Sequence, residues 1–353
     1  MATPRRAEQV VTLPPSGIKA ALRLTLNARR VPCIYGSPGI GKSDVVRQLA
    51  DELYAPAYGL DPAAPPADRP YLVDLRGSLL DPVDLMGLPT VVDGRATFAR
   101  PSWLPTDPRG GVIFLDELTR ASVMVLNALL QFILDRRIGE HRIPDTWQII
   151  AATNRVTDGG GVQRPPAALT ERLVRLDMEP DSDEWSTWAL GAGIHPLTVA
   201  FLRWKPDLFN AFDPGLNVNV NPRSWHFASD LTWQQPAPEI ELALMAGTVG
   251  VGPAGEYLAF IRNFRSCPSP DAIILDPANA PVPGPNEPSS LFAISAALAR
   301  KMDADNAEAI GIYLERMPTE YAAFAWKDAA QRDNGLTHTA AFLTFVVAHP
   351  EIN

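Results

Sequence analysis

The fold of this protein is decided by residues 31–43, which read VPCIYGSPGIGKS. The apolar run 31–35 is typical of a buried strand, and residues 43–53 have the spacing of a helix. The loop between them matches the pattern G-x-x-x-x-G-K-[ST], in which backbone N–H groups surround phosphate oxygens and the lysine reaches the β- and γ-phosphates. We therefore predict a nucleotide-phosphate site formed by Gly36, Ser37, Pro38, Gly39, Ile40, Gly41, Lys42 and Ser43.

Two carboxylates follow another apolar run. Residues 112–117 read VIFLDE, so a predicted buried strand ends directly in Asp116 and Glu117. The carboxyl ends of parallel strands share one edge of a sheet, which brings both carboxylates to the phosphate loop. We predict that Asp116 and the Ser43 hydroxyl bind Mg²⁺. Glu117 is expected to polarise the water that attacks the γ-phosphate of ATP.

A third polar residue ends the next strand. The predicted strand 148–153 is followed by Asn154. An amide at this position is suited to orient the attacking water. The alternative interpretation is an asparagine that only favours the turn at a strand end.

The order of the predicted elements indicates the fold class. Helices are predicted over 17–29, 43–53 and 122–134, and strands over 31–35, 71–75, 112–115, 148–153 and 174–178. Apolar strands alternating with helices indicate an α/β fold, a parallel sheet with helices on both faces. An Asp-Gly pair predicts a hairpin over 91–98. After residue 180 the pattern is helical.

The composition excludes several classes of protein. The chain has 353 residues, enough for two or three domains, and 46% of them are hydrophobic, which excludes wholesale disorder. A net charge of −9 makes a nucleic-acid partner held through its phosphates unexpected. Two cysteines and five scattered histidines form no disulfide scaffold or recognisable metal motif. Without a signal-peptide core or an apolar run of ~20 residues, the chain is expected in the cytoplasm.

Six segments resemble the AAA+ ATPases, and among them the MoxR-like (dynein-related) branch. They are GSPGIGKS (36–43), VIFLDELTRA (112–121), LNALLQFILDRRI (126–138), IIAATNR (149–155), PAALTERL (166–173) and NPRSW (221–225). Residues 79–105 are also similar to the helix-plus-hairpin insertion of that branch. The resemblance covers about residues 17–230 and implies an AAA+ core followed by an α-helical lid.

The resemblance implies roles for further residues. Asn154 corresponds to sensor 1, and Arg223 to the sensor 2 arginine of the lid. Arg172 corresponds to the arginine finger that acts on nucleotide held by a neighbouring subunit, although the family usually has phenylalanine where Leu173 follows it. Arg164 and Arg175 are nearby alternatives for the finger.

Four segments are expected along the chain. Residues 1–180 form the AAA+ nucleotide-binding core, with the insertion at about 77–100. Residues 181–265 form the helical lid, and a C-terminal helical bundle covers 290–353. A proline-rich linker, 266–289, separates the lid from the bundle.

The expected function is hydrolysis of ATP to ADP and phosphate by a homo-oligomeric ring, with six subunits as the family expectation. The resemblance implies chaperone-like work, the remodelling or activation of a partner protein, and suggests a partner with a von Willebrand factor A-type domain. A DNA-handling ATPase of the clamp-loader or helicase-loader type is the alternative. A GTPase is less compatible, because Asn154 and the residues after it do not form N-K-x-D. A scaffold that binds ATP without turnover is a further alternative, against which Glu117 and Arg172 argue.

Overall fold

The structure is a computed structural model that describes residues 10–158 and 165–350. These residues form two units. The first contains the chain up to Asp181 together with Phe212–Leu216, and the second contains Ser182–Ala211 and the chain from Asn217 onward.

The first unit is an α/β unit. Its strands are β1 (Thr12–Leu13), β2 (Val31–Tyr35), β3 (Leu72–Arg76), β4 (Pro89–Val92), β5 (Arg95–Phe98), β6 (Gly111–Asp116), β7 (Arg137–Ile138), β8 (His141–Arg142), β9 (Trp147–Thr153) and β10 (Leu173–Met178). Its α-helices are α1 (Pro15–Asn27), α2 (Lys42–Tyr54), α3 (Pro82–Met86), α4 (Val123–Asp135) and α5 (Ala167–Thr170).

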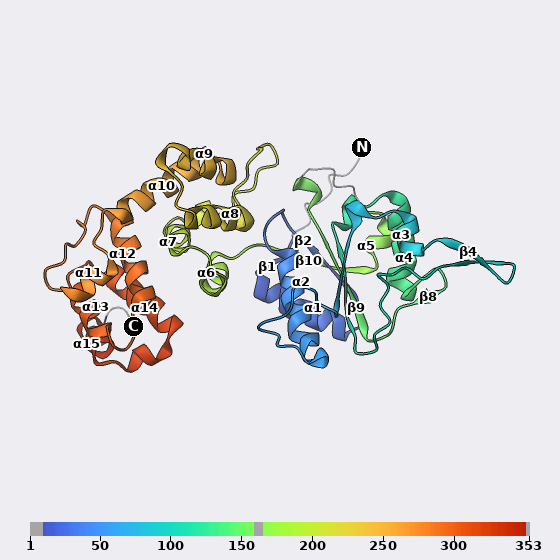
Figure 1. The fold of residues 1–353 in the computed structure, drawn as a ribbon, viewed down its shortest axis with the longest axis horizontal. Coiled ribbons are helices and arrows are strands. Elements are labelled where there is room, and N and C mark those ends of the chain that lie inside the picture. The colour runs from blue at the N-terminus through green and yellow to red at the C-terminus, as the bar shows by residue number, and fades with distance from the viewer. Residues whose placement is uncertain (1–9, 159–164, 351–353) are drawn as a thin grey trace, which may run out of the picture. The chain divides into compact units, whose positions relative to one another are not determined.

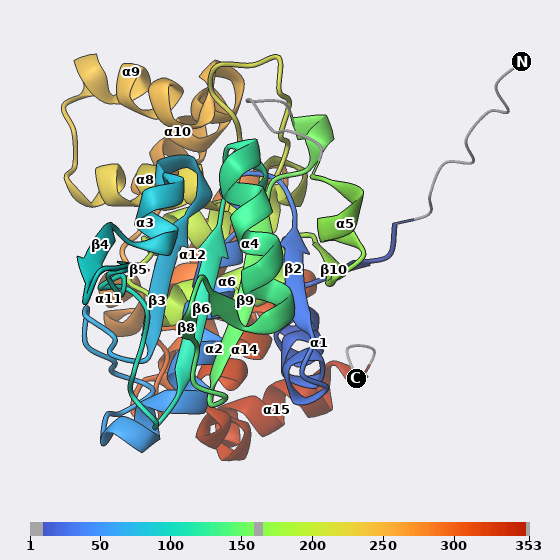
Figure 2. The same ribbon diagram turned by 90° about the vertical axis from the view of Figure 1, so that its right-hand side faces the viewer.

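Six strands form one sheet in the order β1-β10-β2-β9-β6-β3, and every pair in it is parallel. Figure 2 shows this order from β10 to β3, with α4 in front of the sheet. The predicted parallel α/β fold is therefore confirmed. The strand β2 lies between β10 and β9, so the loop that leaves β2 is flanked by the carboxyl ends of both neighbours.

Alternate residues of the central strands enter two hydrophobic cores, one on each face of the sheet. In β6, Val112 and Phe114 pack with the apolar residues of α1 and α2, whereas Ile113 and Leu115 pack with those of α3 and α4. Burial on both faces explains why these strands are apolar throughout in sequence.

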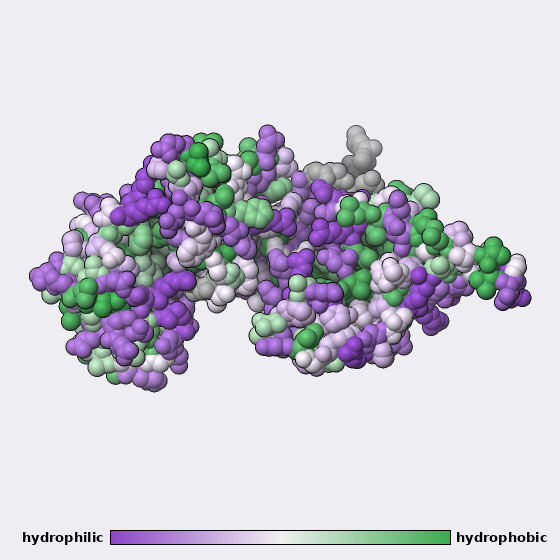
Figure 3. All heavy atoms as spheres, in the orientation of Figure 1, coloured by the Kyte–Doolittle hydropathy of each residue, from purple (hydrophilic) through white to green (hydrophobic). Residues whose placement is uncertain are grey.

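The predicted hairpin is β4–β5, which follows α3 and extends beyond the sheet in Figure 1. Its residues Val91 and Val92 are 77% and 55% exposed. Figure 3 shows hydrophobic residues gathered near its tip, whose outermost residues are hydrophilic.

The second unit is helical. It contains α6 (Ser182–Gly191), α7 (Pro196–Trp204), α8 (Pro222–Trp233), α9 (Pro238–Val249), α10 (Val251–Arg265), α11 (Pro270–Leu275), α12 (Pro288–Lys301), α13 (Ala307–Leu314), α14 (Thr319–Arg332) and α15 (Ala340–Ala348). None of the helices in the described residues is long and apolar enough to cross a membrane.

Two hydrophobic cores of this unit meet at α12. Ala293 packs with residues of α7, α8, α9 and α10, whereas Leu291, Ile294 and Leu298 pack with residues of α11, α13, α14 and α15. The predicted lid and the predicted bundle therefore share one helix. The proline-rich segment 266–289 also contains α11, which the sequence does not predict; Ile273 of this helix is fully buried.

Candidate nucleotide site

The phosphate loop connects β2 to α2. Gly41 has φ +96° and precedes the first residue of α2, a conformation that favours glycine. Gly36 lies in a crowded position, where a Cβ atom would approach Ile40 Cδ1 to 2.5 Å and the Met178 carbonyl oxygen to 3.0 Å. These two glycines are required for the backbone to take this path.

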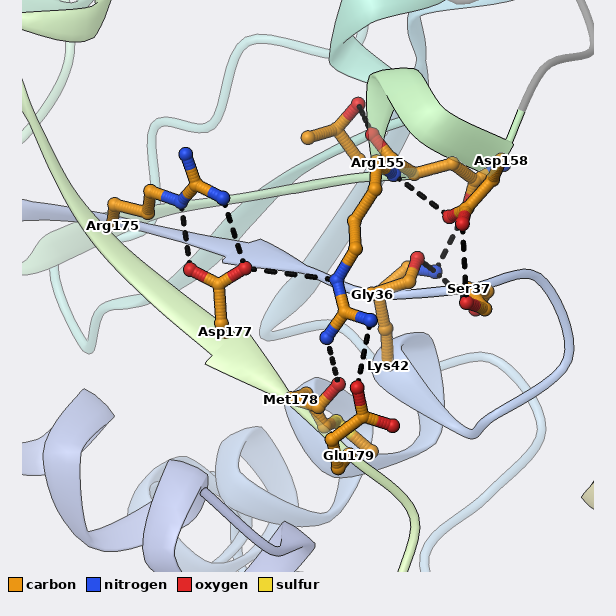
Figure 4. A network of polar contacts seen from close by, with 11 residues as sticks. Gly36, Ser37, Lys42, Arg155, Asp158, Arg175, Asp177, Met178 and Glu179 are labelled. Atoms are coloured by element: carbon orange, nitrogen blue, oxygen red, sulfur yellow. Dashed lines mark hydrogen bonds and ion pairs between the residues drawn. The ribbon is translucent and has the colours of Figure 1, made fainter. Parts of the chain in front are cut away.

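Lys42 lies inside the loop, with only 7% of its surface exposed. Its ammonium group donates hydrogen bonds to the carbonyl oxygens of Gly36 (2.6 Å) and Ser37 (2.8 Å) and to Asn154 Oδ1 (2.8 Å). Figure 4 shows Lys42 beside the start of the loop. The structure thus brings together two residues that the sequence places 112 positions apart.

Ser43 and Asp116 also meet. The Ser43 hydroxyl donates to Asp116 Oδ2 at 2.8 Å, and Asp116 Oδ1 accepts from the Glu117 backbone N–H at 2.8 Å. Mg²⁺ in phosphate sites is commonly bound by one or two protein oxygens, with phosphate oxygens and water completing the shell. Adjacent hydroxyl and carboxylate oxygens fit that requirement.

A second carboxylate, which the sequence analysis does not identify, lies near this pair. Asp74 of β3 has a raised pKa, because burial disfavours its charged form and Asp116 adds negative charge nearby. The Arg47 guanidinium lies 3.6 Å from Asp74 and offsets part of this effect.

Glu117 has an unusual backbone conformation, φ 52° and ψ 37°, in the left-handed region. Its carboxylate accepts a hydrogen bond from the Ser78 hydroxyl and lies 3.6 Å from the Arg120 guanidinium. Gly77 permits this approach, since a Cβ atom there would lie 2.7 Å from the Glu117 carbonyl oxygen. Gly77 and Ser78 were not predicted as site residues, because no local pattern relates them to a strand end 39 positions away.

The three arginines proposed for the finger differ in their surroundings. Arg172 donates to the Ala168 carbonyl of α5, while its buried Nε has no hydrogen-bond partner in the described chain. Arg175 binds both carboxylate oxygens of Asp177 and stacks over the Tyr35 ring at 4.6 Å. Arg164 lies outside the described residues.

Arg223 lies in the second unit, in the first turn of α8. This turn is fixed by a capping box between Asn221 and Ser224. The exposed Arg223 side chain lines a pocket of about 600 Å³, together with Phe227 and Thr248 among others. Arg223 is therefore accessible to a ligand of that unit.

The described ranges contain no cluster of three His, Cys, Asp or Glu side chains able to hold a metal ion. Burial raises the pKa of the Cys33 thiol to about 12, which leaves it a neutral apolar residue of β2.

Comparison with known proteins finds one family and several solved structures. A family model for the AAA domain of the dynein-related subfamily matches residues 32–173. NtrX from Brucella abortus is 15% identical, with 99% of this chain and 70% of that chain covered and a TM-score of 0.36. NtrX in complex with ADP is 16% identical, with coverages of 98% and 70% and a TM-score of 0.36. A provisionally named ATPase from Cytophaga hutchinsonii is 14% identical, with coverages of 90% and 81% and a TM-score of 0.37. No curated protein matches.

The matched residues include the phosphate loop, the Asp116–Glu117 strand end and Asn154, which the first unit holds at one edge of its parallel sheet. The sequence motifs, the parallel sheet and the family model all indicate an AAA domain. Residues 32–173 are an AAA domain of the dynein-related subfamily, as the resemblance of the sequence motifs implies.

Proposed function

We propose that this chain hydrolyses ATP to ADP and phosphate with Mg²⁺ as cofactor. The observation that carries the proposal is the 2.8 Å contact between the Ser43 hydroxyl and Asp116 Oδ2. This contact brings the phosphate loop and the acidic strand end to one place. Lys42 and Asn154 lie at the same edge of the sheet.

Each residue of the site has a distinct task in this proposal. The loop N–H groups and Lys42 bind the β- and γ-phosphates, and Mg²⁺ held by Ser43 and Asp116 would neutralise phosphate charge. Glu117 accepts a proton from the attacking water, whose oxygen bonds to the γ-phosphorus as the bond to the β,γ-bridging oxygen breaks. The Asn154 amide orients that water or the transferred phosphoryl group.

We further propose that the chain works as a cytoplasmic ring, with six subunits as the family expectation. Arg172 would reach nucleotide bound by a neighbouring subunit, and Arg223 would contact nucleotide from the lid. The same proposal assigns the ring the remodelling or activation of a partner protein, of which the von Willebrand factor A-type domain is one candidate. The net charge of −9 supports a protein partner over DNA.

Phosphate release under steady-state conditions tests the proposal. Lys42→Ala should lose ATP binding, because the charge on the phosphates is removed, whereas Lys19→Ala, a lysine of α1 that pairs with Glu52, should retain it. Glu117→Gln should bind ATP and hydrolyse it at least ~100-fold more slowly. Glu52→Gln is the matched control for the carboxylate.

Three outcomes would contradict the proposal or a part of it. Unchanged ATP affinity in Lys42→Ala would remove the phosphate loop from the site. A strictly monomeric protein, with and without a slowly hydrolysed ATP analogue, would contradict the ring. Stimulation of ATP turnover by DNA at physiological salt would favour the DNA-handling alternative.

A further inference from the structure

Arg155, the residue after Asn154, extends from the end of β9 to the end of β10. Its guanidinium donates to the Met178 carbonyl at 3.1 Å, lies 2.7 Å from Glu179 Oε1 and lies 3.7 Å from Asp177 Oδ1. Figure 4 shows this side chain directed at the last residues of β10. One side chain thus contacts the last two residues of β10 and the residue that follows them.

The Arg155 side chain extends past the end of β2, where the phosphate loop begins, because β2 lies between β9 and β10. The Gly36 N–H donates to the Thr153 carbonyl on the β9 side at 3.3 Å. On the β10 side, the missing Cβ of Gly36 leaves room for the Met178 carbonyl. Arg155 therefore connects the two strand ends that flank the first residue of the loop.

The charges around Asp177 favour an arginine at position 155. Asp177 is only 4% exposed, and its carboxylate lies between the guanidinium groups of Arg155 and Arg175. A buried carboxylate is stable only with such partners, and a partly buried ion pair is screened less than one at the surface. The planar guanidinium reaches Asp177, Met178 and Glu179 together, which a lysine ammonium cannot do.

A second connection joins Arg155 to the phosphate loop through Asp158. The Arg155 backbone N–H donates to Asp158 Oδ2 at 3.0 Å, and Asp158 Oδ1 accepts from the Ser37 hydroxyl at 3.3 Å. The residue after Asn154 is thus held by its backbone to the phosphate loop and by its side chain to β10.

We propose that Arg155 is a positioning residue for ATP hydrolysis, and that it acts by holding the Asn154 amide toward Lys42 and the γ-phosphate. The inference rests on the proposed function. Arg155 itself contacts neither Lys42 nor Ser43, so its loss should change the placement of Asn154 and leave the phosphate-binding groups intact. The rate of the chemical step should therefore change more than the affinity for ATP.

The test is a double-mutant cycle on kcat and KM. Arg155→Ala should lower kcat by ~10- to 100-fold with KM within ~threefold of the parent, and Arg155→Lys should recover only part of the rate. In an Asn154→Ala background, Arg155→Ala should lower kcat by less than ~twofold, because its effect passes through Asn154.

The matched control is Arg69→Ala, which removes a guanidinium from the buried Asp51 of α2 in the same unit. It should lower the melting temperature and leave kcat within ~twofold of the parent. Circular dichroism and binding of an ATP analogue show whether each variant is folded, and Arg155→Gln and Arg155→Lys replace Arg155→Ala if it does not fold.

Two results would overturn the inference by itself. The first is that Arg155→Ala lowers kcat by the same factor in the parent and in the Asn154→Ala background. The second is that Arg155→Ala raises KM and does not lower kcat. A parent rate no higher than that of Glu117→Gln would instead overturn the proposed function, and this inference with it.

Discussion

The Ser78 hydroxyl donates a hydrogen bond to the Glu117 carboxylate, across the carboxyl ends of β3 and β6. The two strands are paired up to Arg76 and Asp116, so the residues that follow each strand meet beyond the sheet. Glu117 keeps a left-handed backbone at this point, a conformation that costs energy in a non-glycine residue. The segment after β3 is thus part of the support of the proposed catalytic base.

Gly77→Ala should slow hydrolysis without removing ATP binding. The new Cβ would lie 2.7 Å from the Glu117 carbonyl oxygen and 3.1 Å from Ala121 Cβ, so the backbone that carries Glu117 must move. A displaced catalytic group typically costs ~100-fold in rate, and we expect a loss of kcat of about that size. Ser78→Ala should lose ~threefold to tenfold, the range of an ordinary intramolecular hydrogen bond, and Ser78→Thr should retain the rate. Parent-like kcat in Gly77→Ala would show that Glu117 does not depend on this support.

Mixing two inactive variants tests whether Arg172 acts between subunits. Arg172→Ala should bind ATP and hydrolyse it slowly, because an arginine at the transition state is worth ~10³-fold or more. Lys42→Ala should be inactive because its own site cannot bind nucleotide. A Lys42→Ala subunit still has Arg172, so it can complete the filled site of an Arg172→Ala neighbour. We expect mixed assemblies to regain activity, measured as phosphate release across mixing ratios.

Arg175→Ala is the control for Arg172→Ala in the same mixing experiment. Arg175 is held by Asp177 of its own chain, so Arg175→Ala should not be complemented by Lys42→Ala in this manner. Activity that stays at the sum of the two variants, in assemblies shown to be mixed, would exclude Arg172 as the finger.

His195 should make the second unit less stable at acid pH. Burial, followed by the positive charges of Arg300 and Arg265, lowers the pKa of His195 from 6.5 to about 4. Its neutral Nδ1 accepts from the Leu197 N–H and caps α7. Because the folded pKa is depressed, the unfolded chain binds more protons between these pH values, and stability falls as pH falls from 6.5 to 4.

His195→Asn separates capping from titration, since asparagine also caps helices and does not titrate. Urea unfolding followed by tryptophan fluorescence measures the free energy of unfolding at each pH. We expect the parent to lose more stability than His195→Asn between pH 6.5 and 4. Equal losses in both proteins would show that His195 does not titrate as inferred.

Gly255→Ala should stabilise the second unit. Gly255 lies inside α10, and a Cβ atom there would have no atom within 4 Å. Alanine restricts the unfolded chain and favours the helix, which is worth ~0.5–1 kcal/mol. Gly250→Ala is the matched control: its φ of +87° disfavours alanine, so the same change should be destabilising. The free energy of unfolding, measured for both variants, tests these two expectations. A destabilised Gly255→Ala would contradict the first of them.

The order of apolar strands and helices in the sequence predicts the parallel α/β fold, which the structure has, and the pattern of residues 36–43 predicts a phosphate loop. Burial on both faces makes the strands apolar throughout, so their places in the sequence are visible without the structure. The strand 31–35 was predicted with the bounds that β2 has, and the helix 43–53 differs from α2 by one residue at each end. A glycine-rich loop between such a strand and helix is a local pattern, which can be recognised from a few adjacent residues.

Which side chains lie beside those residues follows from the packing of the whole fold. Ser78 contacts Glu117 and Arg155 contacts β10 because parallel strands distant in sequence end at one edge of the sheet, and no short-range periodicity encodes which side chains then meet. The helix α11 is likewise not evident from the sequence, because it lies in a proline-rich segment. Nor does the sequence show that opposite faces of α12 pack into two different cores. Local sequence specifies which segments are strands and helices, whereas contacts between segments depend on how all of them pack together.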